Sequence, residues 1–296
     1  MTIEKQNGGV APLATLVDSL ESAAVLDTPA KKVGKSVRGK IEPGPVKDAL
    51  SGTWLGHAIH PLLTDVVIGA FMSANLLDLL GGDRDGRASE RLIALGLAAY
   101  APTAITGVSD WADSEVGSES VRRVGLVHAA ANATAASLYA ASLVARLRGS
   151  RGRGKALALA GAGVLGGGGF LGGHLSFVRG VGMNQTEFDA GPSDWAPALP
   201  ASELVEREPK RVIVGDTPVM LVRHSHGIHA IHDRCSHRGC PLSKSEIEGD
   251  TVTCFCHGSR FDLSDGSVLR GPATTPQPAY DAREVAGQIE IRLRSA

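Results

Sequence analysis

Residues 235–240 read CSHRGC, and residues 254–262 read CFCHGSRFD. Cys235 and His237 form a Cys-x-His pair, and Cys254 and His257 form a Cys-x-x-His pair after a gap of sixteen residues (238–253). Two short loops that each supply one thiolate and one imidazole can hold a metal centre between them. Such a donor set suits tetrahedral zinc or a [2Fe–2S] cluster with two thiolates on one iron and two imidazoles on the other. Zinc knuckles and ribbons usually group their ligands as Cys-x-x-Cys, so the spacing favours the cluster.

The four cysteines of the chain, which include Cys240 and Cys256, all lie between residues 235 and 256. Cysteines of an ordinary core would be scattered, and a disulfide-stapled small domain would not have histidines between its cysteines. We therefore interpret the group as a ligand set.

The surroundings of these pairs resemble Rieske [2Fe–2S] domains over residues 197–293. HDRCSHRGCPLS (232–243) is similar to the first cluster loop, and CHGSRFDLSDGSVLRGPATTP (256–276) is similar to the second loop with its proline-rich cover. The resemblance implies that Cys235 and Cys254 bind the first iron, whereas His237 and His257 bind the second.

Cys240 lies three residues after His237, and Cys256 immediately precedes His257. This doublet resembles the quinol-oxidising Rieske proteins of cytochrome bc complexes, whose equivalent cysteines form a disulfide between the cluster loops. Rieske ferredoxins that serve dioxygenases usually lack it. The resemblance implies a Cys240–Cys256 disulfide, with a free buried pair as the alternative.

In bc-type proteins, two further positions near the cluster carry hydroxyl groups that form hydrogen bonds to its sulfur atoms. Ser259 stands where bc-type proteins place a hydroxyl that bonds a bridging sulfide, and Phe261 replaces their tyrosine, whose hydroxyl bonds a ligand sulfur. One donor is kept and one is absent. We therefore expect a potential between the ends of the Rieske range of about −150 to +300 mV.

The sequence around the cluster loops predicts short strands broken by Gly, Pro and Asp. This pattern predicts an all-β antiparallel sandwich for residues 197–296. The strand-like stretches are VIVGDTPVMLVR (212–223), IHAIHD (228–233), TVTCFC (251–256) and GQIEIRL (287–293).

The first half of the chain is poor in charge and contains four apolar segments of about membrane-spanning length. The fourth includes GAGVLGGGGFLGG (161–173). So many glycines would destabilise a helix in water, but small residues let membrane helices pack closely. We expect a four-helix transmembrane bundle, and a soluble bundle is the alternative because Asp65, Asn75 and Asp78 lie in the first segment. The segments are 62–80, 92–108, 126–147 and 156–181.

The same region resembles the small bacterial membrane domains of domain-of-unknown-function family 2231. The resemblance rests on HPLLTDVVIGA (60–70) and covers about residues 55–182. It implies topology and little chemistry. The predicted organisation is a polar and basic tail with a short amphipathic helix (1–54), a four-span membrane domain (55–182), a linker (183–196) and the cluster domain (197–296).

Alternating spans place His60, His128 and His174 on the membrane face from which the cluster domain emerges. Ionisable groups at membrane depth usually face the bundle interior. Two of these histidines could bind a b-type haem, or the group could line a quinone pocket. The simpler alternative is that they cap helices and form hydrogen bonds within the bundle.

The orientation follows from basic residues near the spans, because short cytoplasmic loops are enriched in Lys and Arg. The loops after the first and third spans hold eight such residues, against five on the opposite face. This count predicts a multi-pass protein of the cell membrane with an exoplasmic cluster domain. The eight are Arg84, Arg87, Arg91, Arg146, Arg148, Arg151, Arg153 and Lys155, and the five are Lys40, Lys47, Arg122, Arg123 and Arg179.

The predicted function is electron transfer in a membrane protein, between the cluster and a partner such as a quinone, cytochrome or other oxidoreductase. The alternative is a Rieske ferredoxin on a passive membrane anchor. A terminal oxygenase is not expected, because only 39 residues (258–296) follow His257, too few for a domain that holds a second iron site. The net charge of −1 gives no general attraction to nucleic acid. Whether the chain has turnover of its own stays open.

Overall fold

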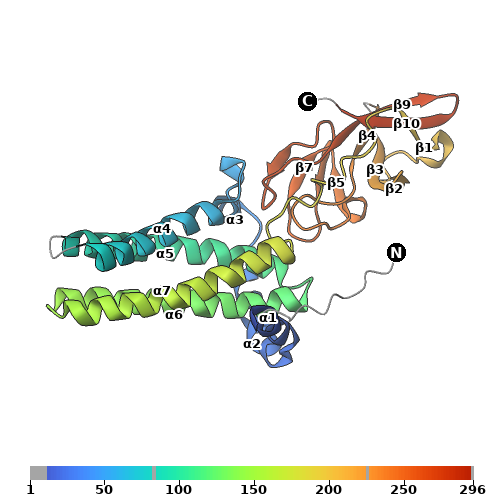
Figure 1. Ribbon diagram of the computed structural model, residues 1–296. Helices are drawn as coiled ribbons and strands as arrows, with labels where there is room; N and C mark the ends of the chain where they lie inside the picture. Colours follow the sequence, from blue (N-terminus) through green and yellow to red (C-terminus); the bar gives the residue numbers. More distant parts are fainter. Residues whose placement is uncertain (1–11, 82–84, 225–226, 295–296) are drawn as a thin grey trace. The chain divides into compact units, whose positions relative to one another are not determined.

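The computed structural model describes residues 12–81, 85–224 and 227–294 (Figure 1). The chain forms two compact units. One comprises Met1–Lys40 and His60–Val181, and the other comprises Ile41–Ile59 and Gly182–Ala296. The segment Ile41–Ile59, which the sequence analysis placed mainly in the N-terminal tail, therefore belongs with the C-terminal domain.

The first unit is helical. Among its described residues, three helices are long and apolar enough to cross a membrane: α4, α5, and α7 with its extension to Val178. The helix at the third predicted span, α6, is equally long but is not among these three. Its first turns carry Arg122 and Arg123, and Asn132 interrupts its apolar stretch. The expected helical character of this domain is thus confirmed, and three of the four expected spans meet the criteria for crossing a membrane. The helices are α1 (Pro12–Ser22), α2 (Asp27–Arg38), α4 (Ile59–Leu80), α5 (Gly86–Ser114), α6 (Glu119–Leu147) and α7 (Arg151–Gly173), followed by the π-helical η4 (His174–Val178).

The four long helices share one apolar core around two stacked rings. Phe71 and Tyr139 lie 3.8 Å apart between ring centroids, with their planes 4° from parallel. Gly161 makes this packing possible, because a Cβ atom there would lie 3.0 Å from the Tyr139 ring. The glycines predicted to allow close packing therefore do so at this point. The buried core residues are Val67, Phe71, Ala74, Ile93, Ala135, Tyr139, Ala158 and Leu165.

Helices α1 and α2 pack against the long helices of this unit through apolar side chains and several ion pairs. Val17 is buried against α6 and α7. Arg123 forms a bidentate pair with Asp27, with N–O distances of 2.9 and 2.8 Å. Glu115 accepts hydrogen bonds from both Arg38 and Arg122, each 2.7 Å long. Buried charges need such partners, so these pairs hold the N-terminal helices in place.

The second unit is an antiparallel β domain with two sheets and one short helix, α3 (Pro45–Ser51). The larger sheet has the order β1-β10-β9-β4-β3-β2, and the smaller has the order β5-β6-β7-β8. The apolar core between them includes Met220, Phe261 and Leu263. The strands are β1 (Ala196–Pro200), β2 (Lys210–Val214), β3 (Thr217–His224), β4 (Gly227–His232), β5 (Glu246–Glu248), β6 (Thr251–Thr253), β7 (Arg260–Asp262), β8 (Val268–Arg270), β9 (Ala279–Val285) and β10 (Gln288–Leu293).

Candidate iron–sulfur site

Two loops carry the candidate ligands, and they repeat one backbone pattern. The first loop leaves β4, and the Cys235 N–H donates to the Cys240 carbonyl while the Gly239 N–H donates to the Cys235 carbonyl. The second loop joins β6 to β7. There the Cys254 N–H donates to the Ser259 carbonyl, and the Gly258 N–H donates to the Cys254 carbonyl.

The turn in each loop depends on a glycine four residues after the cysteine. Gly239 has φ +76° and Gly258 has φ +77°, a left-handed conformation that favours glycine. The Cys-x-x-x-Gly spacing, which occurs in both loops, is a signal that the sequence reasoning did not use.

Cys235 and Cys254 lie side by side in the core with 1% and 2% of their surface exposed. Their side chains are hydrogen-bonded to each other. This bond lowers the pKa of the Cys254 thiol to about 7, and the same bond together with burial raises the pKa of Cys235. The pair therefore favours one thiolate, the form in which cysteine binds metals.

Backbone amides point at both sulfur atoms. The N–H groups of His237 and Arg238 donate to Cys235, and those of Cys256 and His257 donate to Cys254. Such donors stabilise negative charge on sulfur.

The candidate histidines lie next to each other, one from each loop. The rings of His237 and His257 have centroids 5.0 Å apart, and their planes are nearly perpendicular. Burial holds the pKa of His237 well below its usual range, and the nearby Arg238, His257 and Lys47 lower it further. The ring is therefore neutral, as a metal-binding imidazole must be.

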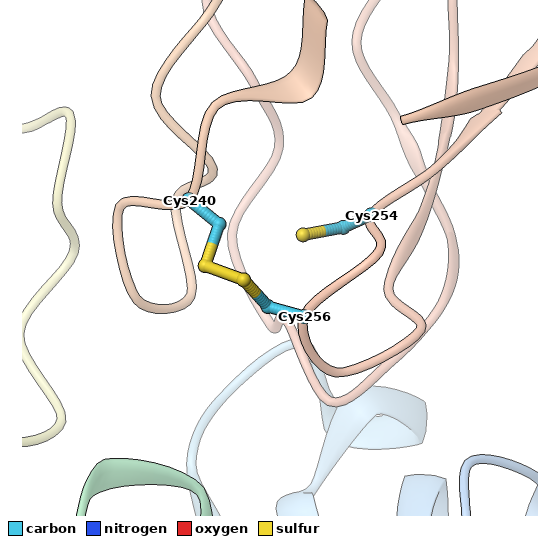
Figure 2. Close-up of side chains that lie close together, drawn as sticks. All are labelled: Cys240, Cys254 and Cys256. Carbon is cyan, nitrogen blue, oxygen red and sulfur yellow. A yellow bond between two sulfur atoms is a disulfide. The ribbon is translucent and has the colours of Figure 1, made fainter. Parts of the chain in front are cut away.

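A disulfide joins the two loops, between Cys240 and Cys256 (Figure 2). The prediction of this bond is confirmed. Figure 2 shows the Cys254 side chain pointing toward it, and the sulfur atoms of all three cysteines lie within 4.8 Å of one another. Only Cys254 among these three can supply a thiolate, because disulfide sulfurs are not available as thiolate ligands.

The side chains behind the cluster loops are fully buried. Ser259 Oγ accepts a 3.0 Å hydrogen bond from the Ala273 N–H, within the proline-rich segment. Phe261 packs in the same apolar core as Cys235 and Cys254. These positions behind the ligands are the ones that the sequence analysis assigned to the two hydrogen-bond donors of bc-type proteins.

The donor set of this site fits a [2Fe–2S] cluster. Two buried cysteines with amides aimed at their sulfurs and two adjacent imidazole rings meet the requirement of two thiolates and two imidazoles.

The three histidines of the helical unit have different partners. His60 Nδ1 lies 3.0 Å from the Thr103 carbonyl, and His128 Nδ1 lies 2.8 Å from the Gly168 carbonyl. His174 Nε2 instead lies 2.7 Å from a carboxylate oxygen of Glu21 on α1. His60 and His128 are close enough to interact electrostatically, whereas His174 is engaged by an N-terminal helix.

Family comparisons agree with both halves of the chain. Residues 194–281 match the model of the Rieske [2Fe-2S] domain, and residues 56–185 match that of a predicted membrane protein family (DUF2231). The chain belongs to the Rieske [2Fe–2S] family, and its N-terminal half carries the DUF2231 membrane domain. Both resemblances inferred from the sequence are confirmed.

Individual relatives match the β domain. The chain is 31% identical to the anthranilate 1,2-dioxygenase ferredoxin subunit of Burkholderia cepacia over 36% of its own length and 97% of that protein. It is 32% identical to a cytochrome b6-f complex iron-sulfur subunit of Nostoc sp., over 31% of its own length and 55% of that protein. The solved ferredoxin of carbazole 1,9a-dioxygenase from Nocardioides aromaticivorans is 25% identical, with a TM-score of 0.32. The match covers 34% of this chain and 100% of that ferredoxin.

Proposed function

We propose that this protein is a membrane-bound electron carrier whose cluster is bound by Cys235 and Cys254 on one iron and by His237 and His257 on the other. It passes single electrons between the cluster and a redox partner in the membrane, a quinone or a b-type haem. One observation carries the proposal. Two hydrogen-bonded buried cysteines and two adjacent histidine rings lie in disulfide-joined loops of a chain with three helices apolar enough to cross a membrane.

The residues of the chain would control the potential and the stability of the site. A bound [2Fe–2S] group supplies one-electron redox chemistry. The amides aimed at Cys235 and Cys254 stabilise negative charge on their sulfur atoms. The Ser259 oxygen accepts a hydrogen bond from the Ala273 N–H, so its hydroxyl proton can be donated to the cluster. The Cys240–Cys256 bond ties the loops together.

In this proposal all four long helices cross the membrane as one bundle, α6 included, within a domain of residues 55–182. A linker (183–196) leads to the cluster domain (197–296). The shared core of α4, α5, α6 and α7 supports this arrangement, because a helix packed among three apolar spans can carry a few polar groups on its inner face.

His60 and His128 are our candidates for the haem or quinone site within the bundle. When a backbone carbonyl accepts the Nδ1–H of an imidazole, Nε2 keeps its lone pair and can bind a metal or accept a proton. Both rings contact a carbonyl through Nδ1. At His128, Nε2 also lies 3.2 Å from the amide nitrogen of Asn132, which a ligand would have to displace. His174 is the weaker candidate, since its Nε2 is held by Glu21.

A second function is a Rieske ferredoxin on a passive membrane anchor that delivers electrons to a separate oxidoreductase. The similarity to a dioxygenase ferredoxin subunit, which extends over 97% of that protein, favours it. The disulfide between the cluster loops favours the first function, because the sequence resemblance ties that feature to quinol-oxidising proteins.

Spectra of the full chain in detergent, produced with iron and haem available, test the proposal. We expect iron–sulfur absorption that bleaches with dithionite and an EPR signal in the reduced state, both lost in Cys235→Ser and His257→Ala. A protein that binds zinc and no iron would refute the cluster. A Soret band that is present in the parent protein and lost in His60→Ala or His128→Ala would support haem. A cluster-loaded protein without that band would leave quinone as the proposed partner, and reduction of the cluster by a soluble quinol tests this. Failure of quinol reduction would favour the passive anchor.

A further inference from the structure

The segment Ile41–Ile59 precedes the first span in the sequence but packs on the cluster loops of the same compact unit. Pro43 lies against the backbone beside His257, since a Cβ atom at Gly258 would lie 2.8 Å from the Pro43 ring. We call Ile41–Ile59 the cover segment.

The other end of the cover segment contacts the proline-rich segment that follows β8. Thr53 Oγ1 donates a 3.4 Å hydrogen bond to the Ala273 carbonyl, and the Gly271 N–H donates to the Asp48 carboxylate. A Cβ atom at Gly271 would collide with Thr53 Oγ1. The cover segment therefore touches both the loop that holds His257 and the stretch that bonds to Ser259.

Lys47 lies between Pro43 and Thr53 in the sequence, on the short helix α3. Only 4% of its surface is exposed. Lys47 follows Pro43 by four residues and precedes Thr53 by six. Its neighbour Asp48 lies against the proline-rich segment, since a Cβ atom at Gly271 would lie 3.1 Å from Asp48 Oδ1. Asp48 is the neighbouring acid on α3, and Arg270 and Arg238 are the other cations of this region.

We propose that the cover segment is a working part of the cluster domain and that Lys47 is a positioning residue that raises the reduction potential. The proposal rests on the cluster assignment made above. One-electron reduction makes the cluster more negative, and a fixed positive charge held nearby in a medium of low dielectric favours the reduced form. Asp48, held on the same helix, has the opposite effect when it is ionised.

Redox titrations of the full chain in detergent, followed by EPR, test the proposal with four variants. Lys47→Met removes the charge and keeps most of the stem, whereas Lys47→Arg keeps the charge. Asp48→Asn removes a negative charge with little change in shape. Lys210→Met removes an equal charge from β2 in the larger sheet and is the matched control. Burial raises the pKa of Asp48, so the titrations are run at about pH 8, well above the usual carboxyl range.

We expect a lower midpoint in Lys47→Met, a midpoint near that of the parent protein in Lys47→Arg and Lys210→Met, and a higher midpoint in Asp48→Asn. Structural damage alone would not shift two neighbouring variants in opposite directions. An unchanged midpoint in Lys47→Met with an intact cluster spectrum would overturn the proposal. If Lys47→Met does not assemble the cluster, Asp48→Asn decides, and an unchanged midpoint there overturns it. A parent protein that lacks the cluster signal refutes the proposed function instead.

Discussion

The Ala273 N–H donates a 3.0 Å hydrogen bond to Ser259 Oγ, which joins the proline-rich segment to the second cluster loop. The serine is fully buried. Because its oxygen already accepts from the backbone, its own proton can be donated to another group, and in the proposed site the cluster would be the acceptor.

Ser259→Ala should lower the reduction potential and also destabilise the β domain. The potential falls because a donor to a sulfide is lost, and leaving the buried Ala273 N–H without an acceptor costs about 1–3 kcal/mol. EPR redox titration and urea unfolding measure the two effects. Ser259→Thr keeps the hydroxyl and is the matched variant. A potential unchanged by Ser259→Ala would contradict the assigned role.

Phe261→Tyr should raise the reduction potential. Phe261 is fully buried in the same core as both cysteine ligands, so a hydroxyl on its ring adds a donor near the sulfur atoms. Redox titration gives the midpoint, and Phe261→Leu, which adds no donor, is the control. An equal or lower midpoint in Phe261→Tyr would count against this account.

Replacing both Cys240 and Cys256 by serine should destabilise the loops that hold the cluster. The bond closes a loop with a sequence separation of 16 residues, and in the chain-entropy model such a cross-link stabilises by about 3 kcal/mol. We expect a lower Tm and faster cluster loss in the presence of an iron chelator, followed by absorption. Cluster retention at the parent rate would show that the loops do not depend on the disulfide.

His232→Gln should make the stability of the β domain less sensitive to acid. His232 is fully buried near Asp189, and burial lowers its pKa below the usual range. The folded domain keeps this ring neutral, whereas the unfolded chain takes up the proton near pH 6.5. Below that pH the unfolded state binds more protons, so stability falls as pH falls. Glutamine cannot take up this proton.

Urea unfolding at about pH 8 and at about pH 5.5, on either side of the usual histidine range, measures the effect. We expect His232→Gln to lose less free energy of unfolding between these two conditions than the parent protein, whatever its stability at the higher pH. Equal losses in both proteins would show that His232 does not contribute to the acid sensitivity.

Fusion of a reporter after Ala296 tests the orientation. The loops after the first and third predicted spans carry eight Lys and Arg residues against five on the other face, so we propose that the cluster domain is exoplasmic. Alkaline phosphatase should then be active at this position. Fluorescence from a reporter that folds only in the cytoplasm would reverse the assignment.

The cluster chemistry and the class of each half of the chain could be predicted from local sequence. The candidate ligands lie in two short stretches, and the spacing of Cys235 to His237 and of Cys254 to His257 is read without knowledge of the fold. The Cys240–Cys256 disulfide was predicted from the resemblance of this cysteine doublet to bc-type Rieske proteins, and the fold confirms it. The apolar segments were recognised because membrane-spanning length and composition are also properties of a continuous stretch.

The distant residues that surround these local features could not be predicted in this way, because tertiary packing sets them. Thr53 meets Ala273 across 220 positions of the chain, and Asp27 meets Arg123 across 96. No local pattern marks such pairs, because each contact depends on how complete elements pack. The basic residue Lys47, which the sequence analysis counted toward membrane orientation, is therefore found beside the cluster loops: its place is set by the packing of α3 on the β domain, a property of the folded chain as a whole.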